Sequence, residues 1–132
     1  MSTHITGKFK YTSWDENAYE ELENGRRLTR ASVAQDLSGD LQGEGSAEWL
    51  MCYRPDKTAT FVGLQRLTGS IGERSGSFVV ESHGTYDGEL ARGRWTVVPG
   101  SGTDDLSEIH GEGTWEAPHG PEATFELDYD LG

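Results

Sequence analysis

The sequence has a single cysteine, four prolines and few basic side chains, and these shortages exclude several classes of protein. Cys52 cannot form an internal disulfide, so the chain lacks the disulfide framework of small secreted domains, and we expect a reducing, cytoplasmic setting. Eleven Lys and Arg stand against 23 Asp and Glu, which gives a net charge of −12. So acidic a protein repels nucleic acid and anionic membranes, and we expect neither as a partner.

Long apolar runs and helical periodicity are missing as well. The N-terminal segment MSTHITGKFKYTSWDE has no apolar region of a secretory signal, and no stretch approaches the roughly 20 apolar residues of a membrane helix. The segment SWDENAYEELENG could form a helical turn, but its acidic run is more typical of a solvated loop. At 132 residues the chain fits one domain, over 1–132.

The sequence is rich in glycine, with 18 residues, and in turn signals. Period-two alternation in ATFELDYDL places Phe125, Leu127 and Tyr129 on one face of a strand and acidic residues on the other. Eight candidate strands lie between turn signals, at 5–14, 28–36, 46–53, 58–67, 76–85, 91–98, 111–116 and 123–131. We therefore expect an all-β fold, a single closed antiparallel β-barrel of about eight strands, because closure removes exposed edges.

The stretch WTVVPGSGTDDLSEIHGEGTW, from Trp95 to Trp115, holds the one short helix that we expect. A phosphate-binding loop would need a lysine after its glycines, whereas here two aspartates follow Gly102 and Thr103. Two carboxylates suit the positive end of a helix, with Thr103 as its N-cap and Gly111 behind its end. The stretch is therefore mainly architectural.

Three segments carry a resemblance to a known family: GEGSAEWLMCYRPDKTATFVGLQRLTGSIGERSGSFVV, GTYDGELARGRWTVVPGSGTDDLSEIHGEG and LDYDL. From about Gly39 onward the chain resembles an uncharacterised bacterial family of small barrels, a domain of unknown function related in fold to plant allene oxide cyclase. The resemblance implies an antiparallel barrel whose Pro-Gly-Ser-Gly-Thr segment leads into a short helix that helps close one end. It implies no established activity. Members usually carry a histidine at the place of Ser82, whereas this sequence has His83.

Two residues, Glu48 and His83, are candidates for acid–base catalysis. Glu48 lies in AEWLMCY, where both strand faces are apolar, so a raised pKa would suit a general acid or base; the alternative is an ion pair with Arg66. His83 shares a strand face with Glu81, whose carboxylate could orient the imidazole. The opposite face is more apolar and smaller, which favours an outward direction for both; it is made by Phe78, Val80, Ser82 and Gly84.

Six residues are candidates for ligand binding. Gln65 could present an amide to a ligand in an apolar interior, or satisfy backbone groups there. Aromatic side chains at alternate strand positions fill barrel interiors, either as core or as pocket lining. The candidates are Trp49, Phe61, Gln65, Phe78, Trp95 and Tyr129. The four histidines show no metal-ligand spacing and no serine-nucleophile motif occurs, so we expect no metal and no cofactor.

Three functions remain open on these observations. The barrel binds a small apolar or amphipathic molecule in its interior; or it is a cofactor-free isomerase or cyclase acting on a small organic substrate inside the barrel; or it is a packed structural homodimer without a ligand. The strand from Trp49 to Tyr53 is apolar on both faces and a barrel buries only one, so we expect a homodimer through this strand. Alternatively, the loop from Asp15 to Asn24 covers the outer face and keeps the protein monomeric.

Overall fold

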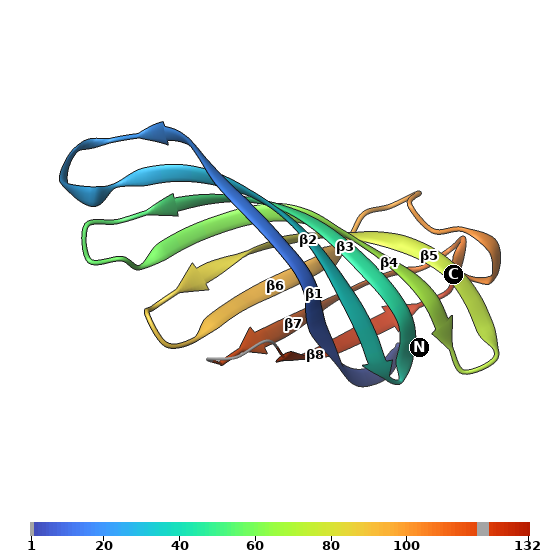
Figure 1. The fold of residues 1–132 in the computed structure, drawn as a ribbon. Coiled ribbons are helices and arrows are strands. Elements are labelled where there is room, and N and C mark those ends of the chain that lie inside the picture. The colour runs from blue at the N-terminus through green and yellow to red at the C-terminus, as the bar shows by residue number, and fades with distance from the viewer. Residues whose placement is uncertain (1, 119–121) are drawn as a thin grey trace.

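Eight antiparallel strands close into one barrel, which confirms the expected all-β fold (Figure 1). The computed structural model describes residues 2–118 and 122–132. Each strand pairs with the next in the chain, and the last pairs with the first. The strands are β1 (Thr3–Glu21), β2 (Arg27–Gly39), β3 (Leu41–Tyr53), β4 (Ala59–Ile71), β5 (Arg74–Tyr86), β6 (Ala91–Val97), β7 (His110–Ala117) and β8 (Glu122–Asp130).

The N-terminal hairpin differs most from the expected strands. β1 continues to Glu21, which lies opposite Arg27 on β2, and the 3-10 turn η1 (Glu23–Gly25) joins the two strands. The acidic segment after Asp15 is therefore strand, and the expectation of a loop or a helical turn there is wrong. Pairing with β2 satisfies the backbone of this segment while most of its charged side chains stay exposed. In Figure 1 the hairpin extends beyond the neighbouring strands.

The barrel interior is filled by apolar side chains from alternate positions of every strand, as the period-two pattern predicts. At its centre Phe9, Trp95 and Phe125 are in mutual contact, with ring centroids 5.1 to 6.4 Å apart. All three side chains are buried. The terminal segment ATFELDYDL follows the expected alternation, because Phe125, Leu127 and Tyr129 are buried while the residues between them are not.

A loop between β6 and β7 closes one end of the barrel, and its side chains Leu106 and Ile109 are buried there. The expected short helix is only a 3-10 turn, η2 (Asp104–Leu106). Thr103 does not cap it with its side chain; its Oγ1 instead accepts a hydrogen bond from the Ser77 N–H at 2.9 Å.

The reason for this difference lies in the pairing of β5. β5 pairs with β4 along its whole length but with β6 only from Val80 to Tyr86. The backbone groups on the other edge of its first half therefore need different partners. The loop supplies them: the Ser101 hydroxyl accepts from the Val79 N–H at 3.0 Å, and the Asp105 carboxylate accepts from the Ser75 N–H at 3.0 Å. The loop is thus tied to β5 by side chains, among them Thr103, the residue expected to cap a helix.

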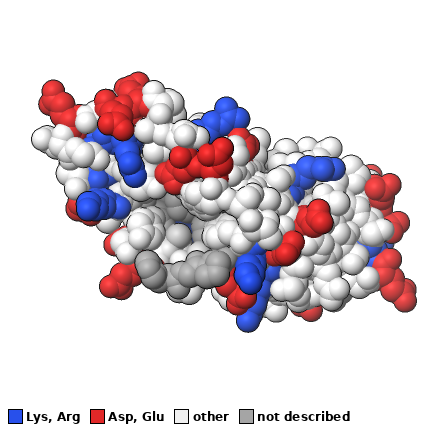
Figure 2. Space-filling model, viewed as in Figure 1, with Lys and Arg blue, Asp and Glu red and all other residues white. Residues whose placement is uncertain are grey.

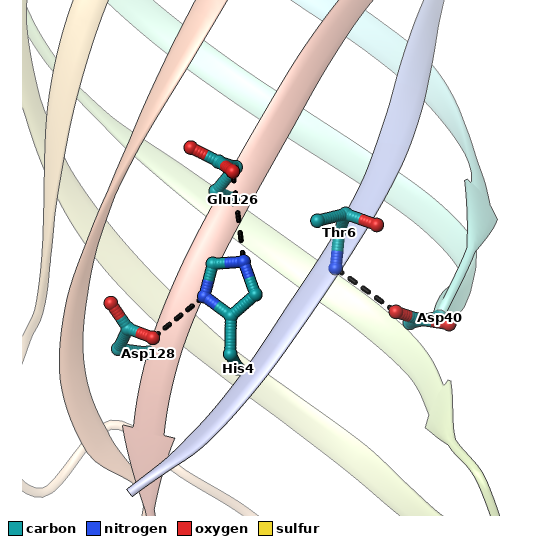
Figure 3. Close-up of polar contacts among 5 residues, drawn as sticks. All are labelled: His4, Thr6, Asp40, Glu126 and Asp128. Atoms are coloured by element: carbon teal, nitrogen blue, oxygen red, sulfur yellow. Dashed lines mark hydrogen bonds and ion pairs between the residues drawn. The ribbon is translucent and has the colours of Figure 1, made fainter.

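The seam between β1 and β8 carries polar contacts on the outside of the barrel (Figure 3). His4 Nδ1 lies 2.7 Å from an Asp128 oxygen and its Nε2 lies 3.6 Å from Glu126, and the bond to Asp128 raises the pKa of His4 above its usual value. At the β2–β3 turn, Asp40 accepts a hydrogen bond from the Thr6 N–H at 3.0 Å. Within residues 2–118 and 122–132, no group of three histidine, cysteine or carboxylate side chains is placed to hold a metal ion.

No helix in the described part of the chain is long and apolar enough to cross a membrane.

Gly102 is predicted to be required for the loop that closes the barrel. A β-carbon at this position would lie 2.0 Å from the Leu106 carbonyl oxygen, so any side chain must displace the turn. We expect Gly102→Val to lower the free energy of unfolding by roughly 2 kcal/mol or more, measured by urea denaturation. The exposed Ser107→Ala in the same loop is the control and should change it by less than about 0.5 kcal/mol. A Gly102→Val protein with the wild-type midpoint would contradict this role.

Candidate functional site

A cavity of about 400 Å³ opens at the end of the barrel that carries the β1–β2, β3–β4 and β5–β6 turns, which we call the mouth. Its volume lies within the range of small-molecule sites, about 300 to 1,000 Å³. Figure 2 shows the molecule hollowed below the β1–β2 hairpin, with acidic and basic side chains along the border. Seven of the lining side chains are aromatic: Tyr11, Trp14, Trp49, Tyr53, Phe61, Tyr86 and Trp115.

The floor of the cavity is formed by Trp49, Phe61 and Trp115, which are all buried. The Phe61 ring lies 5.3 Å from Trp49 and 5.6 Å from Trp115, centroid to centroid. Trp49 lies across Gly63 on β4, where a β-carbon would come within 2.6 Å of the indole. Glycine at this position is therefore what lets the indole lie flat against the neighbouring strand.

One wall of the cavity depends on a β-bulge in β1. The register with β2 shifts between Tyr11 and Ser13. In a regular strand Tyr11 and Trp14 would point to opposite faces, but the extra residue brings both to the cavity, and their rings meet edge to face at 5.2 Å. Strict alternation along β1 could not have placed Trp14 on the same face as Tyr11.

The carboxylate of Glu16 lies behind this wall and accepts three hydrogen bonds. It accepts from the Tyr53 hydroxyl at 2.8 Å, from the Thr29 hydroxyl at 2.8 Å and from the Trp14 indole N–H at 3.0 Å. The contacts fix the side chains of Trp14 and Tyr53 at the mouth. The sequence offered one signal for this site: Glu16 is two residues from Trp14 and so shares its face.

Tyr11 and Tyr53 are neutral hydrogen-bonding groups of the cavity. Burial raises the pKa of Tyr11 to about 12, and burial together with the Glu16 carboxylate raises the pKa of Tyr53 to about 12. Tyr86 donates its hydroxyl to the Gly88 carbonyl at 2.9 Å, in the turn that also carries Glu89. At physiological pH both Tyr11 and Tyr53 are therefore phenols and not phenolates.

A buried polar chain lies deeper in the barrel. The Trp95 indole N–H donates to Gln65 Oε1 at 3.2 Å, and Gln65 Nε2 donates to Gln35 Oε1 at 2.6 Å. The Trp115 indole N–H donates to the Ser82 hydroxyl at 3.0 Å. Among the described residues, Gln35 Nε2 is the buried side-chain polar atom that has no hydrogen-bond partner.

The six predicted ligand-binding residues all face the interior, but only Trp49 and Phe61 line the cavity at the mouth. Gln65 and Trp95 belong to the polar chain, where Gln65 bonds to the side chains of Gln35 and Trp95, whereas the sequence predicted a ligand or backbone groups as its partners. Phe78 and Tyr129 are buried in the core. The prediction identified inward faces correctly and could not tell how far along the barrel axis the cavity extends.

The two predicted acid–base residues lie on the outer surface. The side chain of Glu48 is 48% exposed and pairs with Arg30 at 2.7 Å, not with Arg66. Hydrogen bonds from Ser32 and Arg30 hold the pKa of Glu48 below its usual value, so the raised pKa expected for it is wrong. Leu64 does lie opposite Glu48 on the outer face of β3 and β4, but this face is open to solvent and does not bury the carboxylate.

His83 and Glu81 are exposed, as the face pattern of β5 favoured. Ser82 points inward to Trp115, so a histidine at position 82, as the resemblance implies for the family, would face the interior, whereas His83 lies on the outer surface. Neither Glu48 nor His83 lines the mouth cavity.

An apolar patch lies on the outer surface of β3 and β4. Leu50 is 47%, Val62 50% and Leu64 55% exposed, and Leu50 lies directly opposite Val62. Cys52 is also exposed, so Trp49 and Met51 face the interior while Leu50 and Cys52 face outward. The segment from Asp15 to Asn24 extends the β1–β2 hairpin and leaves this patch open, so the expectation that it covers the patch is wrong.

Comparison with known proteins gives a family and a structural relative. Residues 5–129 match the model of a family described as "Protein of unknown function (DUF3224)". A crystal structure of a protein with unknown function from the DUF3224 family, from Shewanella oneidensis MR-1, is similar over 100% of this chain and 99% of that chain, with 26% sequence identity and a TM-score of 0.81. No curated protein matches the chain.

The buried polar chain predicts an order of stabilities for two matched substitutions. Gln65→Met leaves the Trp95 N–H and Gln35 Oε1 without partners, whereas Gln35→Met leaves only Gln65 Nε2. Since each orphaned buried group costs about 1–3 kcal/mol, Gln65→Met should lower the free energy of unfolding by roughly that much more than Gln35→Met. Thermal and urea denaturation of the two variants measure the difference, and equal losses would show that the chain is not organised as described.

Proposed function

Because the chain belongs to the DUF3224 family of proteins of unknown function, we propose its function from the cavity itself: the barrel binds a small apolar or amphipathic molecule at its mouth. The observation that carries this proposal is the open, aromatic-lined space of about 400 Å³ above the rings of Trp49, Phe61 and Trp115. The rest of the interior is filled by side chains, so the mouth is where the barrel offers apolar surface to a ligand.

The polar groups of the cavity support binding of an amphipathic molecule. Tyr11 brings a neutral hydroxyl into an apolar surrounding, and Glu89 brings a carboxylate to the rim. A few polar groups in an otherwise apolar lining are typical of small-molecule sites, because they fix the orientation of a ligand whose affinity comes from apolar contact. The hydrogen bonds of Glu16 hold the wall in place before any ligand arrives, which reduces the ordering cost of binding.

The cofactor-free isomerase or cyclase is the weaker alternative. It draws on the resemblance to allene oxide cyclase, and a likeness of fold alone does not give a reaction. The candidate acid–base residues Glu48 and His83 lie outside the barrel. Tyr11 and Tyr53, with pKa values of about 12, are poor general bases near neutral pH. Binding is therefore the function that the cavity supports best.

A homodimer is a second proposal, because one specific observation favours it: the exposed patch of Leu50, Val62 and Leu64. A two-fold axis that lies in the interface and crosses β4 at Gly63 would place Val62 of one copy over Leu64 of the other. The same axis would place β3 of one copy over β3 of the other, so that Leu50 also lies within the contact. The patch is thus self-complementary in apolar contact.

The proposed binding site is tested with the uncharged dye N-phenyl-1-naphthylamine, whose fluorescence rises in apolar surroundings. We expect saturable enhancement with the wild-type protein. Ala91→Phe should abolish it by filling the cavity, since Ala91 lines the mouth. The matched control is Ala34→Phe, which adds the same ring at a position paired with Ser46 outside the cavity and should leave the enhancement unchanged. Absent enhancement, or equal enhancement in both variants, would refute the site.

The proposed dimer is tested by light scattering at micromolar concentration, where we expect twice the mass of the chain. Val62→Lys should give the monomer mass, because it places a charge in the centre of the apolar patch. Thr124→Lys, an equal change of charge at an exposed position on β8, should leave the dimer intact. A monomeric wild-type protein, or dissociation by both variants, would contradict an interface on β3 and β4.

A further inference from the structure

We infer that the mouth cavity selects a weakly hydrated organic cation, such as a quaternary ammonium group attached to an apolar body. This inference rests on the proposed binding function and adds the sign of the ligand's charge. It comes from three properties of the lining: its formal charge, its rings and the carboxylate behind its wall.

The formal charge of the lining is negative. Of the lining residues that the structure describes, Glu89 is the only one with a formal charge, and none is Lys or Arg. An anionic ligand would lose its hydration on entering and would gain no cationic partner there. A cation would meet the Glu89 carboxylate at the rim, within a protein whose net charge of −12 already attracts it.

The rings of the lining favour a cation over a neutral group of equal shape. Aromatic faces attract cations through their quadrupole, most strongly in Trp and Tyr, and most of the cavity rings are of these two types. Tyr53 shows the preference within the molecule, because the Arg27 guanidinium already lies 4.8 Å from its ring centroid. Arg27 itself does not line the cavity.

Glu16 strengthens this preference. Its carboxylate accepts hydrogen bonds from Trp14 at 3.0 Å and from Tyr53 at 2.8 Å, so both donors point their polar hydrogens at an anion. Donation to a carboxylate raises the electron density of the donor ring, which deepens its attraction for a cation on its face. Glu16 and Glu89 thus place one carboxylate behind the cavity wall, on β1, and one at the cavity rim, in the β5–β6 turn.

The same lining argues for a quaternary or otherwise alkylated cation. A primary ammonium group has three strong hydrogen-bond donors that need acceptors, whereas this cavity is lined mainly by aromatic rings and offers their faces instead of acceptors. An alkylated cation has little hydration to lose and presents apolar surface to those faces. Its apolar body would rest on Trp49, Phe61 and Trp115 with the charge toward the rim.

Three probes of matched shape test the inference: benzyltrimethylammonium, its uncharged isostere neopentylbenzene, and the anion phenylmethanesulfonate. Binding is followed by intrinsic tryptophan fluorescence, since Trp14, Trp49 and Trp115 line the cavity, and by calorimetry. We expect the cation to bind about tenfold more tightly than the neutral isostere, and the anion to bind most weakly. Raising the salt concentration should weaken the binding of the cation and of neither other probe.

Two variants of equal charge change identify the source of the preference. Glu89→Gln should weaken cation binding about threefold and leave the neutral isostere unchanged. Glu81→Gln removes a carboxylate from the outer surface of β5 and should affect neither probe. Equal or tighter binding of the neutral isostere, preference for the anion, or equal effects of both variants would overturn the inference while leaving the binding function intact. If the uncharged naphthylamine dye and all three probes fail to bind, the proposed function falls as well.

Discussion

Closure of the sheet by the pairing of β1 with β8 is the constraint on which the rest of the structure depends. A closed sheet has one inside and one outside, so every residue of a strand is assigned to one of them by its position alone. Most acidic side chains can then stay in water while most aromatic ones converge in the interior. A shift of one residue moves a side chain to the other face of the sheet. The histidine at position 83 lies outside, whereas the serine at position 82 accepts a hydrogen bond from a buried indole.

The cavity is the part of the barrel interior, at the mouth, that side chains leave unfilled. The β6–β7 loop inserts Leu106 and Ile109 at the closed end, and rings occupy the centre. At the mouth Ala59, Ala91 and Ala117 stand where larger residues would fill the space, so the lining is aromatic on some strands and small on others. A binding space formed in this way needs no separate domain or inserted segment, only a change of residue size along a few strands.

Strand positions and faces could be predicted from the sequence, because period-two alternation and turn residues are local properties. All eight predicted strands exist, and the six predicted ligand-binding residues point inward. The errors have non-local causes. Thr103 bonds to the part of β5 that β6 does not reach, and strand pairing brings Arg30 to Glu48. Trp14 reaches the cavity through a bulge, and alternation within single strands did not show that Trp14, Tyr53 and Tyr86 meet at one cavity.

The hairpin of β1 and β2 has a consequence for where the molecule opens. Among the described residues, β1 pairs with β8 from Thr3 to Lys10 and its pairing from Tyr11 to Glu21 is with β2, so the resistance of backbone amides to hydrogen exchange should fall from the closed end toward the mouth. The wall residues Trp14 and Glu16 lie in this less protected part. A bound molecule would therefore hold together the segment that opens most readily, and its occupancy would be recorded as slower amide exchange in this hairpin, with the closed end unchanged.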